Sequence, residues 1–415
     1  MNQFVNPGVQ LACRVLTTAG NHSDPVGGTP LALGGMMDLL TPVCWAPVLG
    51  CTAWIICGLL GIACVTRRAR RGRPGPLLPV TVLKPLAGHD PDLYANLESF
   101  FRQDHPDYEL VLGVEDPADP SVRVVRSLMC RYPEVPARLV IHEGGRGSNP
   151  KVRNLLGMLP HARHDWLLVS DSNIRAPEHY VRELAAEATR RSDIGVVTNL
   201  FAGTGEESLG AALECVQLNG FCAAGMALPT VLGDPVVTGK SMLFSRRVLE
   251  QLGGLERAQH VLAEDYFLGK LFQHAGYRVV LAPTVLHNHI GRLGTLAFLR
   301  RHLRWAMLRW RLRPGTGLLE VATSPLALLP LALVVLGPWA IAWAAALLVL
   351  RDVGGWLMLR GPRGAYWPCL LGPLRELASL LVWALAPLKR HVSWRGHRVR
   401  LGMGTLLFEE PPRPR

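Results

Sequence analysis

The chain has 415 residues, of which 49% are hydrophobic, and a formal net charge of +12, with arginine far outnumbering lysine. A soluble chain of this length would usually form two or three domains. The charge does not indicate nucleic-acid binding, because no such motif is present and the arginines gather beside apolar stretches, where an anionic membrane surface explains them better. The nine cysteines lack metal-binding spacing, so we expect thiols in a reducing setting rather than a disulfide framework.

The first apolar segment predicts a transmembrane anchor over residues 41–66. Trp45–Val65 carries no charge and is long enough to cross a bilayer as a helix. Five arginines follow at once: Arg67, Arg68, Arg70, Arg71 and Arg73. The positive-inside rule then places the next domain in the cytoplasm, on the inner membrane if the source is bacterial. A cleavable signal peptide would need a basic region before the apolar one and a small-residue cleavage site after it, and neither is evident.

Residues 1–40 mix Gly, Thr, Asn and Pro, and we expect a flexible tail. Met36 and Met37 are alternative start sites, because the anchor begins directly after them. The sequon Asn21-His22-Ser23 would matter only in a secretory protein, which the cytoplasmic assignment does not favour.

Two further apolar segments lie near the other end of the chain. Residues 321–350 are uncharged and predict one tilted or kinked span. Residues 366–388 predict a second, although Arg375-Glu376 would be costly at mid-membrane unless buried against protein or mutually paired. A shallow interfacial hairpin is the alternative for this segment. We expect residues 389–415 to form a basic cytoplasmic tail.

Between the anchor and the later spans, residues 76–315 alternate between strand-like and helix-like patterns. Strands are expected at 78–83, 110–114, 138–141 and 166–169. Helices are expected after Asp90-Pro91, over 121–131 and after Asn149-Pro150-Lys151. This alternation predicts a Rossmann-like α/β domain with a mostly parallel sheet covered on both faces.

Three acidic sites follow in order along this domain. Asp116 and Asp171 each come just after a predicted strand, and the carboxyl ends of strands in open α/β sheets face one ligand-binding edge. Asp265 lies in a predicted helical stretch, beside Glu264. Carboxylates at such an edge suit a divalent metal that bridges a diphosphate, and a third suits general base chemistry. The alternatives are a turn aspartate for Asp116 and a helix-capping pair for Glu264-Asp265.

A cationic cluster comes later in the domain. Arg301, Arg304 and Trp305 share one helical face, with further arginines around them. A basic amphipathic helix lying on the membrane would explain the cluster by itself. The acids upstream favour a second interpretation, because a diphosphate leaving group needs cationic groups to hold it.

The chain resembles the ceramide glucosyltransferases, membrane-bound GT-A enzymes of glycosyltransferase family 21. Their pattern of three acids followed by (Q/R)XXRW is matched by Asp116, Asp171, Asp265 and Arg301–Trp305. Further similar stretches are Leu83–Leu86, Asn149–Val152, Asp171–Arg175, Gly239–Met242 and Trp394–Gly396. Together they cover about residues 40–402. One departure is Asn173, which stands where many GT-A enzymes have the second Asp of a DxD metal motif.

The resemblance implies a GT-A domain that transfers a hexose, glucose above all, from a UDP-sugar to the primary hydroxyl of ceramide with inversion. It implies that Asp265 is the base and that Arg301, Arg304 and Trp305 hold the leaving UDP and the acceptor. It further implies that the donor is bound by Lys84, Asp116, Lys151, Asp171, Asn173 and Lys240, with Mg²⁺ or Mn²⁺ at Asp171.

Three other functions stay open from the sequence. Glycosyltransferases that modify hopanoids share the same skeleton, so another membrane lipid is an alternative acceptor. A processive polysaccharide synthase has similar motifs, but three expected spans are too few for a polymer channel. A non-enzymatic membrane protein of this fold would be expected to have lost one or more acids, and all are present.

Overall fold

A computed structural model of the protein describes residues 31–67, 77–88, 90, 92–144, 146–394 and 397–409. The chain forms two compact units, residues 1–43 and 44–415. The expected tail before residue 31, the sequon, the four arginines from Arg68 to Arg73, the Arg395-Gly396 part of one family stretch and residues 410–415 lie outside the described residues.

An eight-stranded sheet forms the centre of the second unit, in the order β3-β2-β1-β4-β7-β6-β8-β5. The strands are β1 (Val80–Pro85), β2 (Tyr108–Val114), β3 (Ala137–Ile141), β4 (Trp166–Val169), β5 (Ile174–Arg175), β6 (Ile194–Thr204), β7 (Met242–Ser245) and β8 (Arg278–His289). Strands β1 to β4 pair in parallel, as do β6 and β8, whereas β7 and β5 pair antiparallel to their neighbours. The expected mostly parallel α/β sheet is confirmed.

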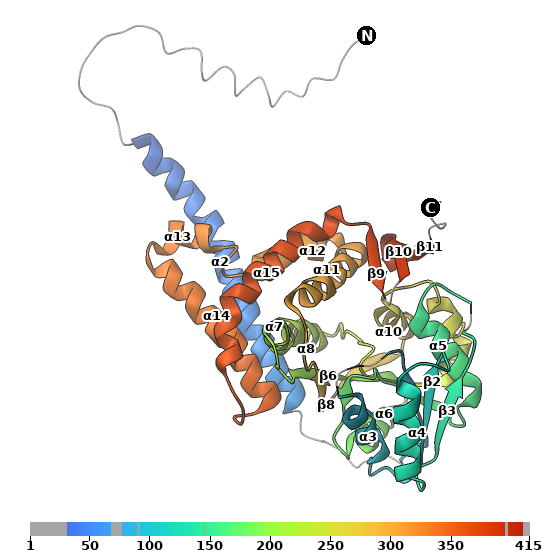
Figure 1. The fold of residues 1–415 in the computed structure, drawn as a ribbon. Helices are drawn as coiled ribbons and strands as arrows, with labels where there is room; N and C mark the ends of the chain where they lie inside the picture. Colours follow the sequence, from blue (N-terminus) through green and yellow to red (C-terminus); the bar gives the residue numbers. More distant parts are fainter. Residues whose placement is uncertain are drawn as a thin grey trace, which may run out of the picture. The chain divides into compact units, whose positions relative to one another are not determined.

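Helices cover both faces of this sheet (Figure 1). They are α3 (Leu93–Phe101), α4 (Ser121–Arg131), α5 (Pro150–Met158), α6 (Tyr180–Ala188), α9 (Arg246–Gln251) and α10 (Glu264–His274), with short turns η1 (Leu159–His161) and η3 (Leu255–Ala258). Neighbouring residues of β1 point to opposite faces, so Val82 packs with α3, α4 and α6 while Leu83 packs with α5 and α10. Every residue of β1 and β2 is buried, including the polar Thr81, Lys84 and Glu109, as expected for strands covered on both faces.

Among the residues that the structure describes, four helices are long and apolar enough to cross a membrane: Val43–Thr66, Leu209–Val231, Trp339–Arg360 and Trp367–Leu388. The first lies within α2 (Leu31–Thr66), which begins ten residues before the expected anchor. The last contains η5 (Trp367–Leu371), α15 (Gly372–Leu385) and η6 (Ala386–Leu388), close to the expected 366–388 segment. Large apolar side chains such as Leu49, Ile341 and Leu377 are exposed on these helices, which suits contact with lipid.

The expected span over 321–350 differs from the structure. This stretch is divided into η4 (Glu320–Thr323), α13 (Leu329–Leu336) and the start of α14 (Trp339–Arg360). Gly337 has a φ of 55°, a conformation that interrupts a helix, and Pro338 then begins a new one. The long apolar helix therefore lies further along the chain and includes Arg351 and Asp352.

Those two charges are buried in an ion-pair network between α14 and α15. Arg351 contacts Glu376 at 2.9 Å, and Arg375 contacts Glu376 at 2.7 Å and Asp352 at 3.2 Å. All four residues are at most 4% exposed. The expectation that Arg375-Glu376 must be paired is met, with the partners supplied by a neighbouring helix.

The Leu209–Val231 segment was not expected as an apolar helix. It comprises α7 (Leu209–Gln217), the π-helical turn η2 (Leu218–Cys222) and α8 (Ala223–Val231). Unlike the other three, it is mostly enclosed by protein, with 83% of its apolar window buried. Asn219 in η2 hydrogen-bonds to both the N–H and the carbonyl of Gly203 on β6, at 2.7 and 3.1 Å. The segment is thus attached to the central sheet.

The last part of the chain is folded where a tail was expected. Helices α11 (Thr295–Leu312), α12 (Pro314–Leu319) and α15 pack together (Figure 1). The rings of Trp310 on α11 and Trp383 on α15 are 6.0 Å apart. A three-stranded antiparallel sheet follows, formed by β9 (His391–Trp394), β10 (His397–Leu401) and β11 (Leu407–Glu409), with the turn η7 (Met403–Thr405). Thr405 accepts a hydrogen bond from Leu262 N–H at 2.9 Å on its carbonyl, and another from Ala263 N–H at 3.3 Å on its hydroxyl. This sheet therefore supports the loop that leads into α10.

Candidate active site

Charged side chains converge at the edge of the sheet where β1 and β4 end. Lys84 is near the end of β1, and Asp171 lies two residues beyond β4. Strand β7 runs antiparallel to β4, so its beginning lies at the same edge and brings Lys240 there. Helices α5 and α10 begin beside them. The expected site residues that the structure brings together are Lys84, Lys151, Asp171, Asn173, Lys240 and Asp265.

Lys84 holds the chain in place rather than facing solvent. It is fully buried, and its Nζ donates to the backbone carbonyl of Asp171 at 2.6 Å and to the Ser170 hydroxyl at 3.3 Å. The ring of Phe100 lies 3.7 Å from the same nitrogen. Burial lowers the pKa of Lys84 well below its usual range. Its position indicates that it fixes the backbone of Asp171.

Asp171 lies between two ammonium groups. Its Oδ1 is 2.8 Å from Lys151 Nζ, and its Oδ2 is 3.4 Å from Lys240 Nζ. Lys240 Nζ also donates to the amide oxygen of Asn173 at 3.2 Å. Burial by itself would raise the pKa of Asp171, but the charges of Lys151 and Lys240 outweigh it and hold that pKa far below its usual range. Asp171 is therefore a carboxylate whose two oxygens both have cationic partners.

Lys151 connects the two acidic sites. Its Nζ is 3.0 Å from Glu264 Oε1 and 3.3 Å from the Gly239 carbonyl, in addition to its contact with Asp171. Burial would lower the pKa of Lys151, but the carboxylates of Asp171 and Glu264 outweigh it and raise that pKa. Asn149 caps α5 by accepting from Lys151 N–H at 2.9 Å, which sets where the lysine leaves the helix.

Asp265 and Glu264 have different environments although they are adjacent. Glu264 is 5% exposed, and its burial, together with the charge of Asp265, raises its pKa. Asp265 is half-buried; its Oδ2 accepts from Gly239 N–H and its Oδ1 from Tyr266 N–H, both at 2.7 Å. Asp265 is thus the member of the pair that a substrate can reach, at the positive end of α10.

Gly239 stands between the two acidic sites, where there is no room for a side chain. A Cβ atom at this position would collide with the Lys151 ammonium and lie 3.5 Å from oxygens of Asp265 and Glu264. The glycine therefore permits its backbone N–H to bind Asp265 while its carbonyl binds Lys151.

The arginine-tryptophan cluster lies on α11 and contacts α7. Glu214 of α7 is fully buried and receives Arg301 Nη1 at 3.2 Å and His302 Nε2 at 2.8 Å. The charge of Arg301 contributes to a lowered pKa of Lys240, after burial as the larger cause, so Arg301 is electrostatically connected to the ammonium cluster. Trp305 packs against the larger core with its ring 5.1 Å from that of His302, and Arg304 is half-buried on the same helix.

Asp116 lies apart from this cluster. It is exposed after β2, where its Oδ1 accepts from Ala118 N–H at 2.8 Å and closes a turn. Its neighbour Glu115 forms the ion pair of this region, with Arg153 at 2.9 Å. The alternative of a turn aspartate agrees with these contacts, and a role in binding uridine stays a prediction.

A divalent metal does not fit the residues as they stand. No group of three or more His, Cys, Asp or Glu side chains that could hold a metal occurs in the described part of the chain. The two oxygen donors expected as ligands, from Asp171 and Asn173, both contact the ammonium of Lys240. A divalent cation between them would meet like charge at close range.

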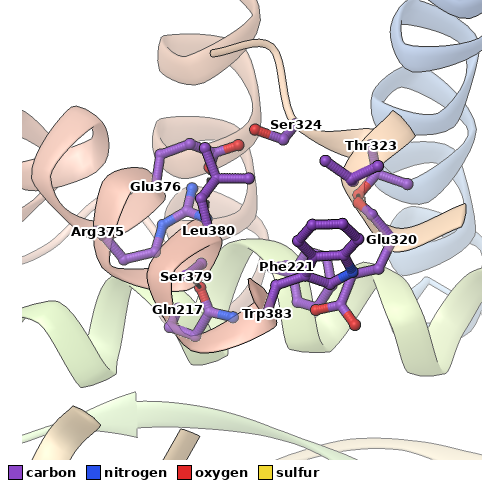
Figure 2. Close-up of a pocket in the computed structure, with 11 residues that line it drawn as sticks. Gln217, Phe221, Glu320, Thr323, Ser324, Arg375, Glu376, Ser379, Leu380 and Trp383 are labelled. Carbon is purple, nitrogen blue, oxygen red and sulfur yellow. Dashed lines mark hydrogen bonds and ion pairs between the residues drawn. The ribbon is translucent and has the colours of Figure 1, made fainter. Parts of the chain in front are cut away.

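A pocket of mixed polar and apolar character lies between α7, η2, η4 and α15 (Figure 2). Gln217, one helical turn after Glu214, accepts from the Ser379 hydroxyl at 3.3 Å. Phe221 and Trp383 provide apolar walls, and Arg375 borders the pocket with its Nε without a hydrogen-bond partner. The pocket thus adjoins both the α7–α11 contact and the buried ion-pair network.

Two acidic partners in this region were not expected from the sequence. Glu264 pairs with Lys151, and Glu214 pairs with Arg301 and His302. Glu264 was visible as the neighbour of Asp265. For Glu214 the sequence offers only a weak indication: a carboxylate inside an apolar stretch usually has a buried cationic partner.

The fold and site together define a glycosyltransferase attached to a membrane: an α/β sheet with charged groups at its carboxyl edge, joined to long apolar helices. The chain belongs to glycosyl transferase family 21, whose family model matches residues 47–407.

Curated relatives and solved structures were also found. Ceramide glucosyltransferase 1 of Caenorhabditis elegans is 26% identical over 352 residues, covering 82% of this chain and 75% of the relative. Ceramide glucosyltransferase 3 of the same organism is 30% identical over 58% of this chain and 52% of its own length. A mannosyltransferase from Pyrobaculum calidifontis, solved with GDP-Man and Mn²⁺, is 19% identical with a TM-score of 0.48, covering 83% of this chain and 99% of the solved chain. Glucosyl-3-phosphoglycerate synthase from Mycobacterium tuberculosis, solved with Mn²⁺, UDP and phosphoglyceric acid, is 17% identical with a TM-score of 0.33, covering 55% of this chain and 78% of the solved chain.

Proposed function

We propose that this chain transfers a hexose, glucose in the first instance, from a UDP-sugar to the primary hydroxyl of ceramide with inversion at the anomeric carbon. The observation that carries the proposal is the arrangement of Asp171 among three lysines at the carboxyl edge of the sheet, with Asp265 held nearby by the backbone of Gly239, in a chain of family 21. The curated relatives are named ceramide glucosyltransferases, which supports a sugar donor and a lipid acceptor.

In the proposed reaction, Asp265 accepts the proton of the acceptor hydroxyl while the oxygen of that hydroxyl bonds to the anomeric carbon. The bond between that carbon and the β-phosphate oxygen breaks, and UDP leaves with the electron pair. Backbone N–H groups hold both oxygens of Asp265, so its direction toward the acceptor is set before the substrate binds. The cationic groups around Asp171 and on α11 would stabilise the charge that develops on the leaving diphosphate.

The remaining residues of the pattern have supporting roles in this proposal. Asp116 would contact uridine, and Arg301, Arg304 and Trp305 would hold the leaving UDP and the acceptor headgroup. The apolar helices keep the site at the lipid surface, and we place the catalytic domain in the cytoplasm. The pocket beside α15 offers amide and hydroxyl groups next to apolar walls, which suits a lipid with a polar headgroup.

The Mg²⁺ or Mn²⁺ expected at Asp171 stays a prediction. Such a cation would offset the charge of the diphosphate only if Lys240 moved away from the oxygens of Asp171 and Asn173. Because both ligands contact Lys240, each step above uses only side chains and backbone groups of the chain.

The test is lipid analysis of cells that lack glycosphingolipids, supplied with ceramide and expressing the chain or its Asp265→Asn variant. We expect a new monohexosylceramide from the unaltered chain and a loss of about 10²- to 10⁴-fold in the variant, the size typical of general base catalysis. Asp107→Asn, on an aspartate whose side chain is 62% exposed, is the matched control and should keep its activity. If both proteins reach the membrane and neither forms the product, ceramide is not the acceptor, and hopanoids should be tested next.

A further inference from the structure

The position between Asp171 and Asn173 is filled by a side chain of the protein itself. Lys240 Nζ is 3.4 Å from Asp171 Oδ2 and 3.2 Å from Asn173 Oδ1. These are the two oxygen donors that a divalent cation would use. An ammonium group is a compact positive charge with three N–H donors, so it can occupy an oxygen-lined position of this kind.

We propose that Lys240 supplies the positive charge that neutralises the donor diphosphate, in place of a divalent metal. The inference rests on the proposed function, because it assumes that a sugar nucleotide binds at this edge of the sheet. Two of the three N–H groups of Lys240 are directed to Asp171 and Asn173, which leaves one for a phosphate oxygen. The lysine is 12% exposed on its side chain, so it is both held in place and reachable.

The use of lysine at this edge is selective. The chain contains only five lysines, against 44 lysine and arginine residues in all. Three of the five converge here: Lys84, Lys151 and Lys240. The other two are Lys270 and Lys389, and the remaining 39 cationic side chains are arginines, whose larger planar guanidinium does not fit a cation-sized position. The distribution indicates that a small point charge is required at this edge.

The surrounding contacts keep Lys240 in this position. Lys84 fixes the backbone of Asp171, and Lys151 fixes its second carboxylate oxygen. Asp171 is therefore presented to Lys240 in one orientation. Arg301 on α11 pairs with Glu214 at 3.2 Å, and its charge also acts on Lys240.

The experiment measures UDP binding and Mn²⁺ binding by the purified full-length chain in detergent. UDP affinity is measured by calorimetry with EDTA and with Mn²⁺, and bound Mn²⁺ is counted by electron paramagnetic resonance. For the unaltered chain we expect the same UDP affinity under both conditions. For Lys240→Met we expect UDP affinity in EDTA to fall about tenfold or more, as for loss of a hydrogen bond to a charged group. We also expect this variant to gain a Mn²⁺ site that Asp171→Asn then removes.

Lys270→Met is the matched control. Lys270 lies on α10 and pairs with Asp234 rather than with Asp171 or Asn173, so this variant should change neither the UDP affinity nor the Mn²⁺ affinity. Lys240→Gln, which keeps a polar side chain, should behave like Lys240→Met if the charge is what matters. The inference is overturned if chelation weakens UDP binding to the unaltered chain tenfold, or if Lys240→Met leaves UDP binding in EDTA unchanged. Absence of UDP binding under every condition would overturn the proposed function itself, and this inference with it.

Discussion

Glu264 and Asp265, the first two residues of α10, have different roles although they are adjacent in the chain. Glu264 points into the protein and pairs with Lys151, whereas Asp265 remains half-buried and bound by backbone N–H groups. Ion pairing makes Glu264 part of the support of the site. Asp265 keeps a half-buried carboxylate at the positive end of a helix.

Gly239 offers a test of this arrangement at the scale of one methyl group. We expect Gly239→Ala to reduce sugar transfer by about tenfold or more, because the new Cβ would displace the Lys151 ammonium from Asp171 and Glu264, and a charge-assisted contact is lost. Transfer is measured with a fluorescent ceramide in membranes. Gly225→Ala is the matched control, since its Cβ would meet nothing within 4 Å and it lies inside α8. Equal activity of both variants would contradict the role given to Gly239.

The ion pairs also predict a pH dependence of stability. The pKa of Asp171 is lowered, so its contribution is present above the unfolded value of about 3.9 and is lost as the pH falls through the folded value. The pKa of Lys151 is raised, so its contribution is present below the unfolded value of about 10.4 and is lost as the pH rises through the folded value.

Between these limits Asp171 and Lys151 both keep their charges, so the ion pair that they form with each other is unchanged. We therefore expect the difference in thermal midpoint between the unaltered chain and Asp171→Asn to stay level from about pH 5 to 9 and to shrink toward lower pH. Thermal scans of the detergent-solubilised proteins at a series of pH values measure this. A difference that changes strongly between pH 6 and 8 would show that another group controls the cluster.

Most residues of the cluster could be predicted, because they lie beside strand ends or in short motifs. Their partners could not. Glu214 lies 87 residues before Arg301 in the chain, and no local pattern connects the two. Asp116 shows the opposite case: its motif position is clear, yet its contacts are those of an ordinary turn.

At the scale of elements, helices α14 and α15 are joined by ion pairs between charged residues that lie within otherwise apolar segments. Arg351 and Asp352 interrupt one apolar stretch, and Arg375 and Glu376 interrupt the next. Each pair looks unfavourable in a span by itself. Together they form a network with two positive and two negative charges. Such pairing makes charged residues tolerable inside an apolar helix bundle.

Removal of one member should therefore be more damaging than its apolar surroundings suggest. We expect Arg375→Met to cost about 3 to 5 kcal/mol, because it leaves two buried carboxylates, Asp352 and Glu376, with Arg351 as their one remaining cation in the network. The measurement is the thermal midpoint of the detergent-solubilised chain. Arg363→Met, on an exposed arginine between the two helices, is the control and should leave the midpoint unchanged. Equal midpoints for both variants would mean that the network does not stabilise the fold.

Element boundaries were less predictable than element types. The expected 321–350 span, predicted as tilted or kinked, is divided at Gly337 and Pro338, whose backbone conformations interrupt the helix despite the apolar composition. The sequence does not predict the Leu209–Val231 helix as an apolar segment, because it contains the polar residues Glu214 and Gln217. Both of these residues are buried against protein. In the C-terminal region, basic side chains suggested a tail, while alternating Val392, Val399 and Leu401 form the apolar side of a small sheet.

At the scale of the whole molecule, the catalytic domain is followed and preceded by apolar helices, and its orientation can be tested with a native side chain. Cys130 is an exposed thiol on α4 of the catalytic domain. If this domain is cytoplasmic, a membrane-impermeant maleimide should label Cys130 only after intact cells are permeabilised.

The measurement compares the unaltered chain with Cys130→Ser, so that labelling of the other cysteines is subtracted. We expect the two proteins to be labelled equally in intact cells and to differ by one thiol after permeabilisation. A difference already present in intact cells would place the catalytic domain outside the cytoplasm.

The contact between Thr405 and the loop before α10 has a consequence for how the protein is made. Thr405 and Ala263 are 142 positions apart, and the apolar helices Trp339–Arg360 and Trp367–Leu388 lie between them. A growing chain can form its sheet early, since β1 to β8 are complete before those helices are synthesised. The loop that presents Asp265 gains its support only after both helices have been synthesised and residue 405 has left the ribosome. A chain that stopped before residue 405 would have the sheet but would lack this support for Asp265.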